Sequence, residues 1–180
     1  MICIYKNVYS PQAALVRFDD LNLIKRAIRE KANDYASRHI RALESIAEGR
    51  RATHKTKNGE APLFLAYYLV RAFLTTEFKF IQAGVRREQL ESAIKKAHHR
   101  PDGVKPADFS NLLYNFAALQ SEKGIRPPIF DYDKASRTMR VVDSTFYFFL
   151  KNTNKNAALD NLNNPLDSHY RICSATKSLS

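Results

Sequence analysis

The sequence predicts an α+β fold that is mainly helical. Apolar residues recur with a period close to 3.6 over most of the first 123 residues, which is typical of amphipathic helices. After Pro127 and Pro128 the period changes to 2, which is typical of strands. The chain has 180 residues and is 44% hydrophobic, enough for one domain with a real core.

The amino-terminal region, residues 1–58, is expected to form an arm followed by a long basic amphipathic helix. Asp19 and Asp20 offer N-cap oxygens, the helix runs to about Glu48, and Gly49 is a suitable terminator. One stripe of this helix is apolar: Leu21, Ile24, Ile28, Tyr35, Leu43 and Ile46. Residues 49–60 contain several basic residues and no large apolar one, and they are expected to be an exposed linker.

Three further helices are predicted before residue 125. Pro62 fits the first turn of a helix that Gly84 ends. A second helix is expected from about Arg86 to His98, and residues 99–105 contain turn-forming Pro, Asp and Gly. A third is expected from Pro106 to about Lys123, with Gly124 as its stop.

The period-2 segment predicts a β-hairpin over residues 129–142 with its turn at residues 134–137. This register pairs Asp133 with Thr138 and Asp131 with Arg140, and it divides apolar from polar side chains between the two faces. A short aromatic helix is expected from Ser144 to Lys151, and residues 153–180 are expected to form a polar, flexible tail.

The charge balance favours an anionic partner. The formal net charge is +11, from 29 Lys and Arg against 18 Asp and Glu. Such an excess attracts polyanions, of which nucleic acid is the commonest. An anionic membrane surface, an acidic protein, or a basic surface that serves solubility alone are the alternatives.

The location expected from the sequence is the cytoplasm. Only two cysteines occur, Cys3 and Cys173, which favours a reducing compartment over a disulfide framework. Residues 1–12 lack the pattern of a signal peptide. The longest apolar stretch, residues 61–74, is too short to span a membrane and contains Arg71.

The order helix, helix, turn, helix, two-stranded hairpin resembles the winged helix-turn-helix superfamily. The resemblance covers about residues 61–150, within an expected domain of residues 59–152. It implies that the helix from Pro106 to Lys123 is a recognition helix and that the hairpin from Ile129 to Val142 is the wing. It further implies insertion of that helix into a DNA major groove and backbone contacts from the wing.

Candidate nucleic-acid contacts follow from this resemblance. Asn111 and Asn115 lie on the outward face of the predicted recognition helix, where their amides suit adenine edges. That face carries no Arg, so a polar, solvated helix face is an equal interpretation. Phosphate contacts are assigned to basic residues of the preceding helix, the turn and the wing: Arg86, Arg87, Lys95, Lys96, Lys105, Lys134, Arg137 and Arg140. An ordinary solvated basic surface is the alternative.

No catalytic, metal or cofactor site is expected. Asp131, Asp133 and Asp143 invite a metal-dependent nuclease, but the hairpin register pairs Asp131 with Arg140 and separates Asp143 from the other two. Adjacent His98 and His99 are expected to point about 100° apart on a helix, a poor geometry for one metal. The chain has five Gly and none in a nucleotide-binding pattern.

The sequence therefore predicts a non-enzymatic protein that binds nucleic acid, expected to be double-stranded DNA, through phosphates with limited base readout. The alternative is a winged-helix adaptor or a subunit of a larger complex. A homodimer or a larger protein complex is expected to form through the amino-terminal helix, and no membrane association is expected. In a bacterium the protein would be nucleoid-associated.

Overall fold

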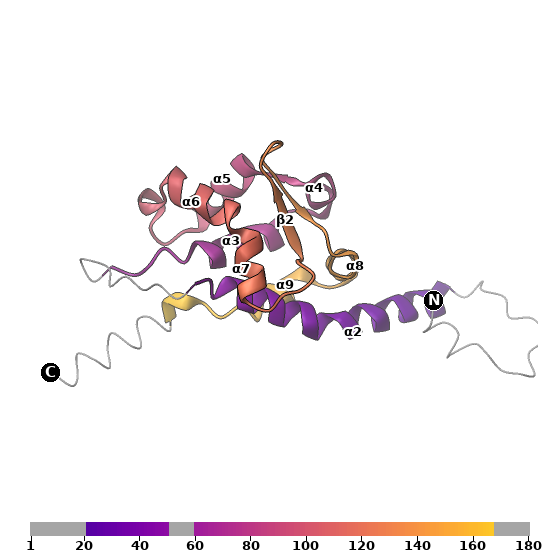
Figure 1. Cartoon of the computed structure of the whole chain (residues 1–180). Coiled ribbons are helices and arrows are strands. Elements are labelled where there is room, and N and C mark those ends of the chain that lie inside the picture. The colour runs from indigo at the N-terminus through magenta and orange to yellow at the C-terminus, as the bar shows by residue number, and fades with distance from the viewer. Residues whose placement is uncertain (1–20, 51–59, 168–180) are drawn as a thin grey trace, which may run out of the picture.

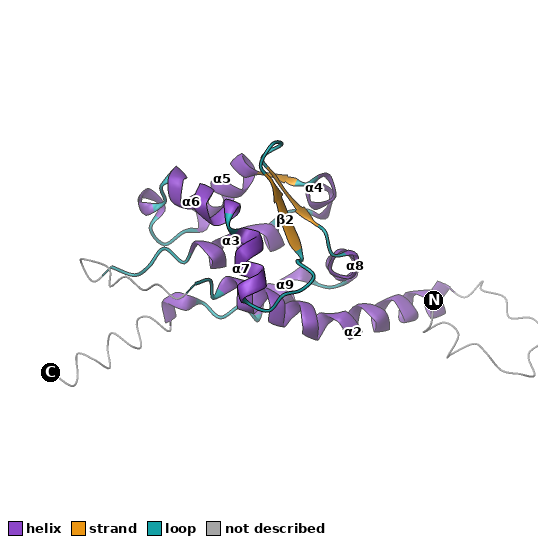
Figure 2. Cartoon of the chain, in the orientation of Figure 1, coloured by secondary structure: helices purple, strands orange, loops and turns teal. Residues whose placement is uncertain are grey.

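The computed structural model describes residues 21–50 and 60–167, and it is a mainly helical α+β fold (Figures 1 and 2). The predicted fold class, the long amino-terminal helix and the hairpin are confirmed. The elements in chain order are α2 (Leu21–Ala47), α3 (Leu65–Thr75), α4 (Phe78–Ala83), β1 (Val85–Arg86), α5 (Arg87–Ala97), the 3₁₀ turn η1 (Pro101–Gly103), α6 (Pro106–Tyr114), α7 (Phe116–Glu122), β2 (Phe130–Asp133), β3 (Thr138–Val141), α8 (Ser144–Asn152) and α9 (Lys155–Asp160).

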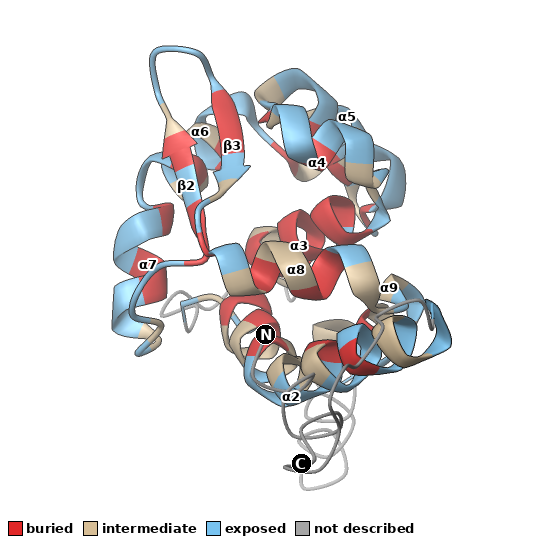
Figure 3. Cartoon of the chain, turned by 90° about the vertical axis from the view of Figure 1, so that its right-hand side faces the viewer, coloured by how far each residue is buried: buried red, intermediate tan, exposed pale blue. Residues whose placement is uncertain are grey.

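Helix α3 is the centre of the core. It is buried on nearly every side, as Figure 3 shows, and Leu69, Phe73 and Leu74 are each at most 1% exposed. A helix that is apolar all round must be covered on all faces. Helices α2, α5, α6 and α9 contact it, and the ring of Phe73 packs edge-on against Phe130 of β2 at 4.8 Å.

Helix α2 belongs to this core over its carboxyl-terminal half. Leu43 and Ile46 are buried against α3 and α8, whereas Leu21 and Ile28 are exposed. The predicted stripe is therefore buried in part. Gly49 terminates the helix as predicted, with φ 64° and an N–H that donates to the carbonyl of Ile46. The expected arm, the caps Asp19 and Asp20, most of the basic linker, and both cysteines lie outside the described residues.

The single helix predicted from Pro62 to Gly84 is wrong, because the structure has two helices there. α3 ends at Thr75, and the hydroxyls of Thr75 and Thr76 donate to carbonyls one turn earlier, which competes with helix continuation. Pro62 lies before α3, separated from it by Leu63 and Phe64, and the φ of Phe64 is +46°. Gly84 ends α4 as predicted.

The hairpin register is confirmed, and a third strand joins it. Asp131 pairs with Arg140 and Asp133 with Thr138, as the alternation predicted. Strand β1 was not expected from the sequence; it pairs with β3 and makes the strand order β1-β3-β2. Arg86 was expected to begin a helix and instead ends this strand, immediately before α5.

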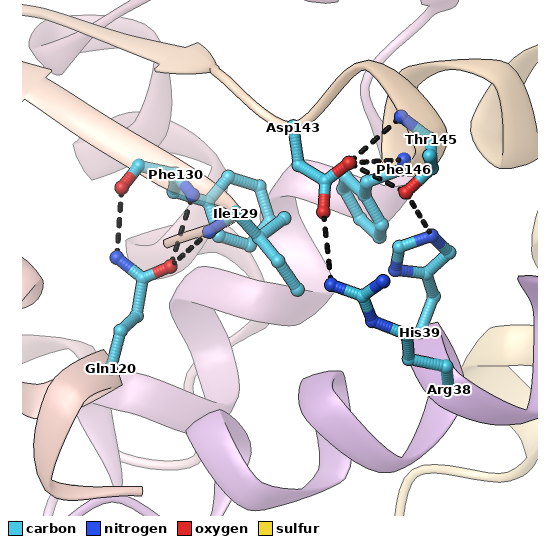
Figure 4. A network of polar contacts seen from close by, with 8 residues as sticks. All are labelled: Arg38, His39, Gln120, Ile129, Phe130, Asp143, Thr145 and Phe146. Atoms are coloured by element: carbon cyan, nitrogen blue, oxygen red, sulfur yellow. Dashed lines mark hydrogen bonds and ion pairs between the residues drawn. The ribbon is translucent and has the colours of Figure 1, made fainter. Parts of the chain in front are cut away.

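Two buried polar side chains join the hairpin to the helices (Figure 4). Gln120 of α7 bonds the backbone of Ile129 and Phe130, where β2 begins. Asp143 caps α8 by accepting from the N–H groups of Thr145 and Phe146. Burial acts to raise the pKa of Asp143, but the hydrogen bond from the Thr145 hydroxyl, together with these N–H bonds, holds it below its ordinary value.

Helices α8 and α9 complete the core. In α8 the residues Phe146, Phe149 and Leu150 are buried, as predicted. Residues 153–180 were expected to form a flexible tail, but α9 forms within that segment and packs on α3, with Ala158 and Leu162 buried. No clear helical pattern is visible in the sequence here, because the segment is rich in Asn and α9 packs through few apolar side chains.

Candidate nucleic-acid interface

One backbone hydrogen bond joins the turn of the hairpin to the start of α5. The N–H of Arg87 donates to the carbonyl of Arg137 at 2.9 Å. Arg137 lies in the turn with φ 52°, a left-handed conformation. As a result, two residues predicted to bind phosphate, separated by 50 positions in the sequence, are adjacent in the fold.

The side chain of Arg87 extends from α5 to the start of α6. Its Nη2 donates to the carbonyl of Pro106 at 3.3 Å, and its guanidinium lies 5.9 Å from the ring centroid of Phe109. Lys105, immediately before α6, is exposed beside this contact. The starts of α5 and α6 and the hairpin turn therefore meet at Arg87.

An aromatic pair lies under the hairpin turn. Lys134 places its Nζ 5.2 Å from the ring centroid of exposed Tyr114 on α6. The ring of Tyr114 in turn lies 5.9 Å from that of Tyr132 on β2. The hydroxyl of Tyr132 is buried without a hydrogen-bond partner, and burial raises its pKa. We call Arg87, Lys105, Tyr114, Lys134 and Arg137 the basic face.

Asp133 shapes the turn that carries two of these cations. Its carboxylate accepts from the hydroxyl of Ser136 at 2.6 Å and from the N–H of Ala135 at 2.9 Å. These hydrogen bonds lower the pKa of Asp133, the hydroxyl bond most of all. The carboxylate of Asp133 therefore stabilises the turn, which is a structural role for this residue.

The remaining predicted phosphate contacts do not all join the basic face. Lys95 pairs with Glu91 at 3.0 Å, and Glu91 also lies 3.9 Å from Arg87, so one carboxylate offsets part of the charge of both. Lys96 is exposed and projects about 100° further round α5 than Lys95.

Arg86 and Arg140 lie on the other face of the sheet from Tyr132. Side chains alternate along each strand, so Tyr132 and Met139 share the buried face, and Arg140 with its partner Asp131 shares the outer one. Arg86 is opposite Thr138 on this outer face. Arg140 thus has an acidic cross-strand partner, Asp131, whereas the partner of Arg86 is the neutral Thr138.

The predicted recognition helix is not continuous. The single helix expected from Pro106 to Lys123 is wrong, because α6 ends at Tyr114 and α7 begins at Phe116. Asn115 stands at the break with φ −100° and ψ 10°, and its Nδ2 donates to the backbone carbonyl of Asn111 at 2.9 Å. This side-chain donor competes for the carbonyl of Asn111 with the backbone N–H groups that would continue the helix.

Asn111 and Asn115 are hydrogen-bonded to each other. The Nδ2 of Asn115 donates to the Oδ1 of Asn111 at 2.6 Å. Both lie at a pocket of about 430 Å³ between α6, the end of α2 and the segment before α3, with Phe64 and Leu112 on its wall. Both asparagines therefore border this pocket, whereas Tyr114 is not among the residues that line it. To bind adenine edges, the two asparagines would have to break the hydrogen bond between them and form hydrogen bonds to the base instead.

The histidines next to the turn form a stacked pair. α5 ends at Ala97, so the expected angle of about 100° between His98 and His99 on a helix is wrong; their rings stack at 4.5 Å and 20°. The Nδ1 of His98 accepts from the N–H of Arg100, which leaves Nε2 to donate to the carbonyl of Leu63. His98 therefore fixes the turn onto the segment before α3.

Metal ligation finds no support among residues 21–50 and 60–167, where no three His, Cys, Asp or Glu side chains are grouped suitably. None of the helices in these ranges is both long and apolar enough to cross a membrane.

Comparisons with protein-family models, with curated proteins and with solved structures gave no match to this chain.

Proposed function

We propose that this protein binds double-stranded DNA without catalysing a reaction, and that the basic face makes the main phosphate contacts. The observation that carries the proposal is the position of Arg87: its N–H bonds the hairpin turn at Arg137, and its side chain bonds the start of α6 at Pro106. In the winged-helix interpretation, these are the wing and the two helices of the helix-turn-helix. The net charge of +11 supports an anionic partner.

Little base readout is expected in this arrangement. The exposed residues of α6 include no Arg, and Asn111 and Asn115 are bonded to each other. Phosphate contacts supply affinity and register without sequence information. Such a protein would act in the cytoplasm, on the nucleoid in a bacterium, and at many DNA sequences of similar affinity.

The test is the salt dependence of DNA binding. Fluorescence anisotropy with a labelled 25-base-pair duplex should show affinity that falls steeply between low and physiological salt, with a slope of about 0.9 in log K per neutralised phosphate. Arg137→Gln should lower that slope by about one contact. Lys151→Gln, an exposed cation of α8 outside the basic face, is the matched control. Absence of binding at low salt would refute the proposal.

The pocket beside α6 favours a second candidate, a protein-interaction adaptor. Its wall includes Leu63, Phe64 and Leu112, which are only partly buried, and its volume of about 430 Å³ suits one or two side chains of a partner. Leu112→Glu would abolish capture of such a partner and leave DNA binding unchanged, which separates the two candidates.

A further inference from the structure

A second basic site lies between α2 and the chain that follows α7. It is a pocket of about 240 Å³, and it stands at the end of the hairpin remote from the turn, since Ile129 on its wall immediately precedes β2. Four of the nine residues that line it are cationic and none is acidic: Arg38, Arg41, Lys123 and Arg126. This combination was not apparent from the sequence, because Arg38 and Arg41 are about 80 positions from Lys123 and Arg126.

Helix geometry explains why these side chains converge. Arg38, Arg41 and Ser45 are spaced by three and four residues, so they lie along one side of α2. On the other wall, Gly124 follows α7 with φ 73°, a left-handed conformation that turns the chain back toward α2. Arg126 comes just after this turn, and its Nη2 donates to the hydroxyl of Ser121 at 2.9 Å.

The four cations differ in how far they are already neutralised. Arg38 lies 3.6 Å from the buried carboxylate of Asp143, as Figure 4 shows, and it is needed there because that oxygen has no hydrogen bond. Lys123 pairs with Glu48 at 3.0 Å, but Glu48 is 73% exposed, and such a pair contributes little. Arg41 makes no ion pair or hydrogen bond with any residue that the structure describes.

We propose that this pocket binds a phosphate group, held by Arg41, Lys123 and Arg126 between α2 and the turn after α7. Arg41 and Arg126 make no ion pair with any described residue, so their charges repel each other across the pocket, and an anion bound between them offsets that repulsion. Guanidinium groups match tetrahedral phosphate oxygens with two parallel N–H donors, and the two arginines approach from different elements. The hydroxyl of Ser45 adds a further donor on the same wall.

The pocket shares no residue with the basic face, so the proposal does not depend on DNA binding there. The phosphate is either free in solution or part of a nucleic-acid backbone. A backbone phosphate at this site would extend the DNA path from the turn of the hairpin along its length to α2. These two sources make different predictions for variants of the pocket.

The experiment measures both sources with the full chain. Inorganic phosphate is titrated calorimetrically at low ionic strength, and a labelled DNA duplex is titrated by anisotropy in a chloride buffer free of phosphate. The variants are Arg41→Gln and Arg126→Gln, with Arg29→Gln as the matched control, because Arg29 is an exposed residue of α2 outside the pocket. Thermal melts establish that each variant remains folded.

Each pocket variant is expected to weaken phosphate binding about tenfold, which corresponds to one lost charged hydrogen bond, and Arg29→Gln to leave it unchanged. If only inorganic phosphate binding weakens, the ligand is a free phosphate; if DNA binding weakens as well or alone, it is a backbone phosphate. The proposal is overturned if both pocket variants bind both probes as tightly as the unaltered protein. Phosphate binding in a protein that binds no DNA would refute the proposed function alone.

Discussion

Gln120 holds Phe130 by both ends of its side-chain amide. Nε2 donates to the carbonyl of Phe130 at 2.8 Å, and Oε1 accepts from the N–H of the same residue at 3.0 Å and from that of Ile129 at 2.8 Å. Gln120 is fully buried, so these bonds form away from water (Figure 4). They connect α7 to the start of β2 and thereby set where the hairpin leaves the helices.

Replacement of this amide should destabilise the fold strongly. Gln120→Leu keeps a similar volume but leaves two N–H groups and one carbonyl buried without partners, so a loss of about 3 kcal/mol is expected in the free energy of unfolding. Urea denaturation measures it. Gln82→Leu changes an exposed residue of α4 and should stay within about 0.5 kcal/mol of the unaltered protein. Equal effects at the two positions would contradict the assigned role.

Gly84 is required by the approach of β3. A Cβ at this position would lie 2.5 Å from Cγ2 of Thr138, and φ is +86°. Gly84→Ala should therefore cost more stability than Gly124→Ala, where φ is +73° but no atom lies within 4 Å. The second substitution should cost about 1 kcal/mol for the backbone conformation alone, and the first at least about 2 kcal/mol.

A double substitution isolates the clash. Thr138→Ser removes Cγ2 but keeps the hydroxyl that donates to the carbonyl of Ser136. In combination with Gly84→Ala it should recover part of the lost stability, so the two changes should be less destabilising together than their sum. If the losses of stability from the two substitutions simply add, the loss caused by Gly84→Ala comes from the backbone conformation and not from the contact with β3.

The buried histidines should make the protein less stable in mild acid. Burial lowers the pKa of both His39 and His98 below the ordinary value of 6.5. Because protons then bind the unfolded chain more readily, the stabilisation is complete above about pH 6.5 and is lost as pH falls through the lower folded values. The slope is at most about 1.4 kcal/mol per pH unit for each histidine.

Urea denaturation at pH 7.5, 6.5 and 5.5 measures this dependence. His98→Gln removes one titrating group and should flatten it, although the variant is less stable at pH 7.5, since Nδ1 of His98 accepts from the N–H of Arg100. Asp143 and Asp133 do not interfere in this range, because their pKa values are lowered from an ordinary value near 4. A pH dependence unchanged in His98→Gln would show that His98 does not titrate on folding.

DNA binding should discriminate weakly between sequences. Asn111→Ala and Asn115→Ala are expected to change affinity by less than about twofold for A·T-rich and G·C-rich duplexes alike, because their amides are bonded to each other beside the pocket. Competition anisotropy with the two duplexes is the measurement. A loss of about 1 kcal/mol or more that is confined to the A·T-rich duplex would instead assign adenine contacts to these residues.

Several elements were predictable because their signals are local. The alternation of apolar and polar residues in 129–142 specifies one register, since a slip by one residue would expose the buried face. Gly49 and Gly84 ended helices as expected, because each adopts a positive φ that most residues avoid. The aromatic helix after Asp143 also followed from spacing alone.

The breaks and the third strand depended on tertiary contacts. β1 has two residues, too few for a periodic signal, and it forms because β3 lies beside it. Helical spacing continues through Asn115 and through Thr76, where side-chain oxygens or amides bond the preceding turn. The candidate site was predicted in part: the turn cations were identified, but their meeting with Arg87 and Tyr114 was not.

The sequence by itself determined the fold class, the hairpin register and the excess of positive charge, because these depend on composition and on periods of a few residues. Only the tertiary structure decided which cations lie together. Arg87 meets Arg137 through a backbone hydrogen bond across 50 residues, and Arg41 meets Arg126 because α2 lies beside the chain that follows α7. Electrostatic attraction for an anion depends on distances in space, and those are set by the core around α3.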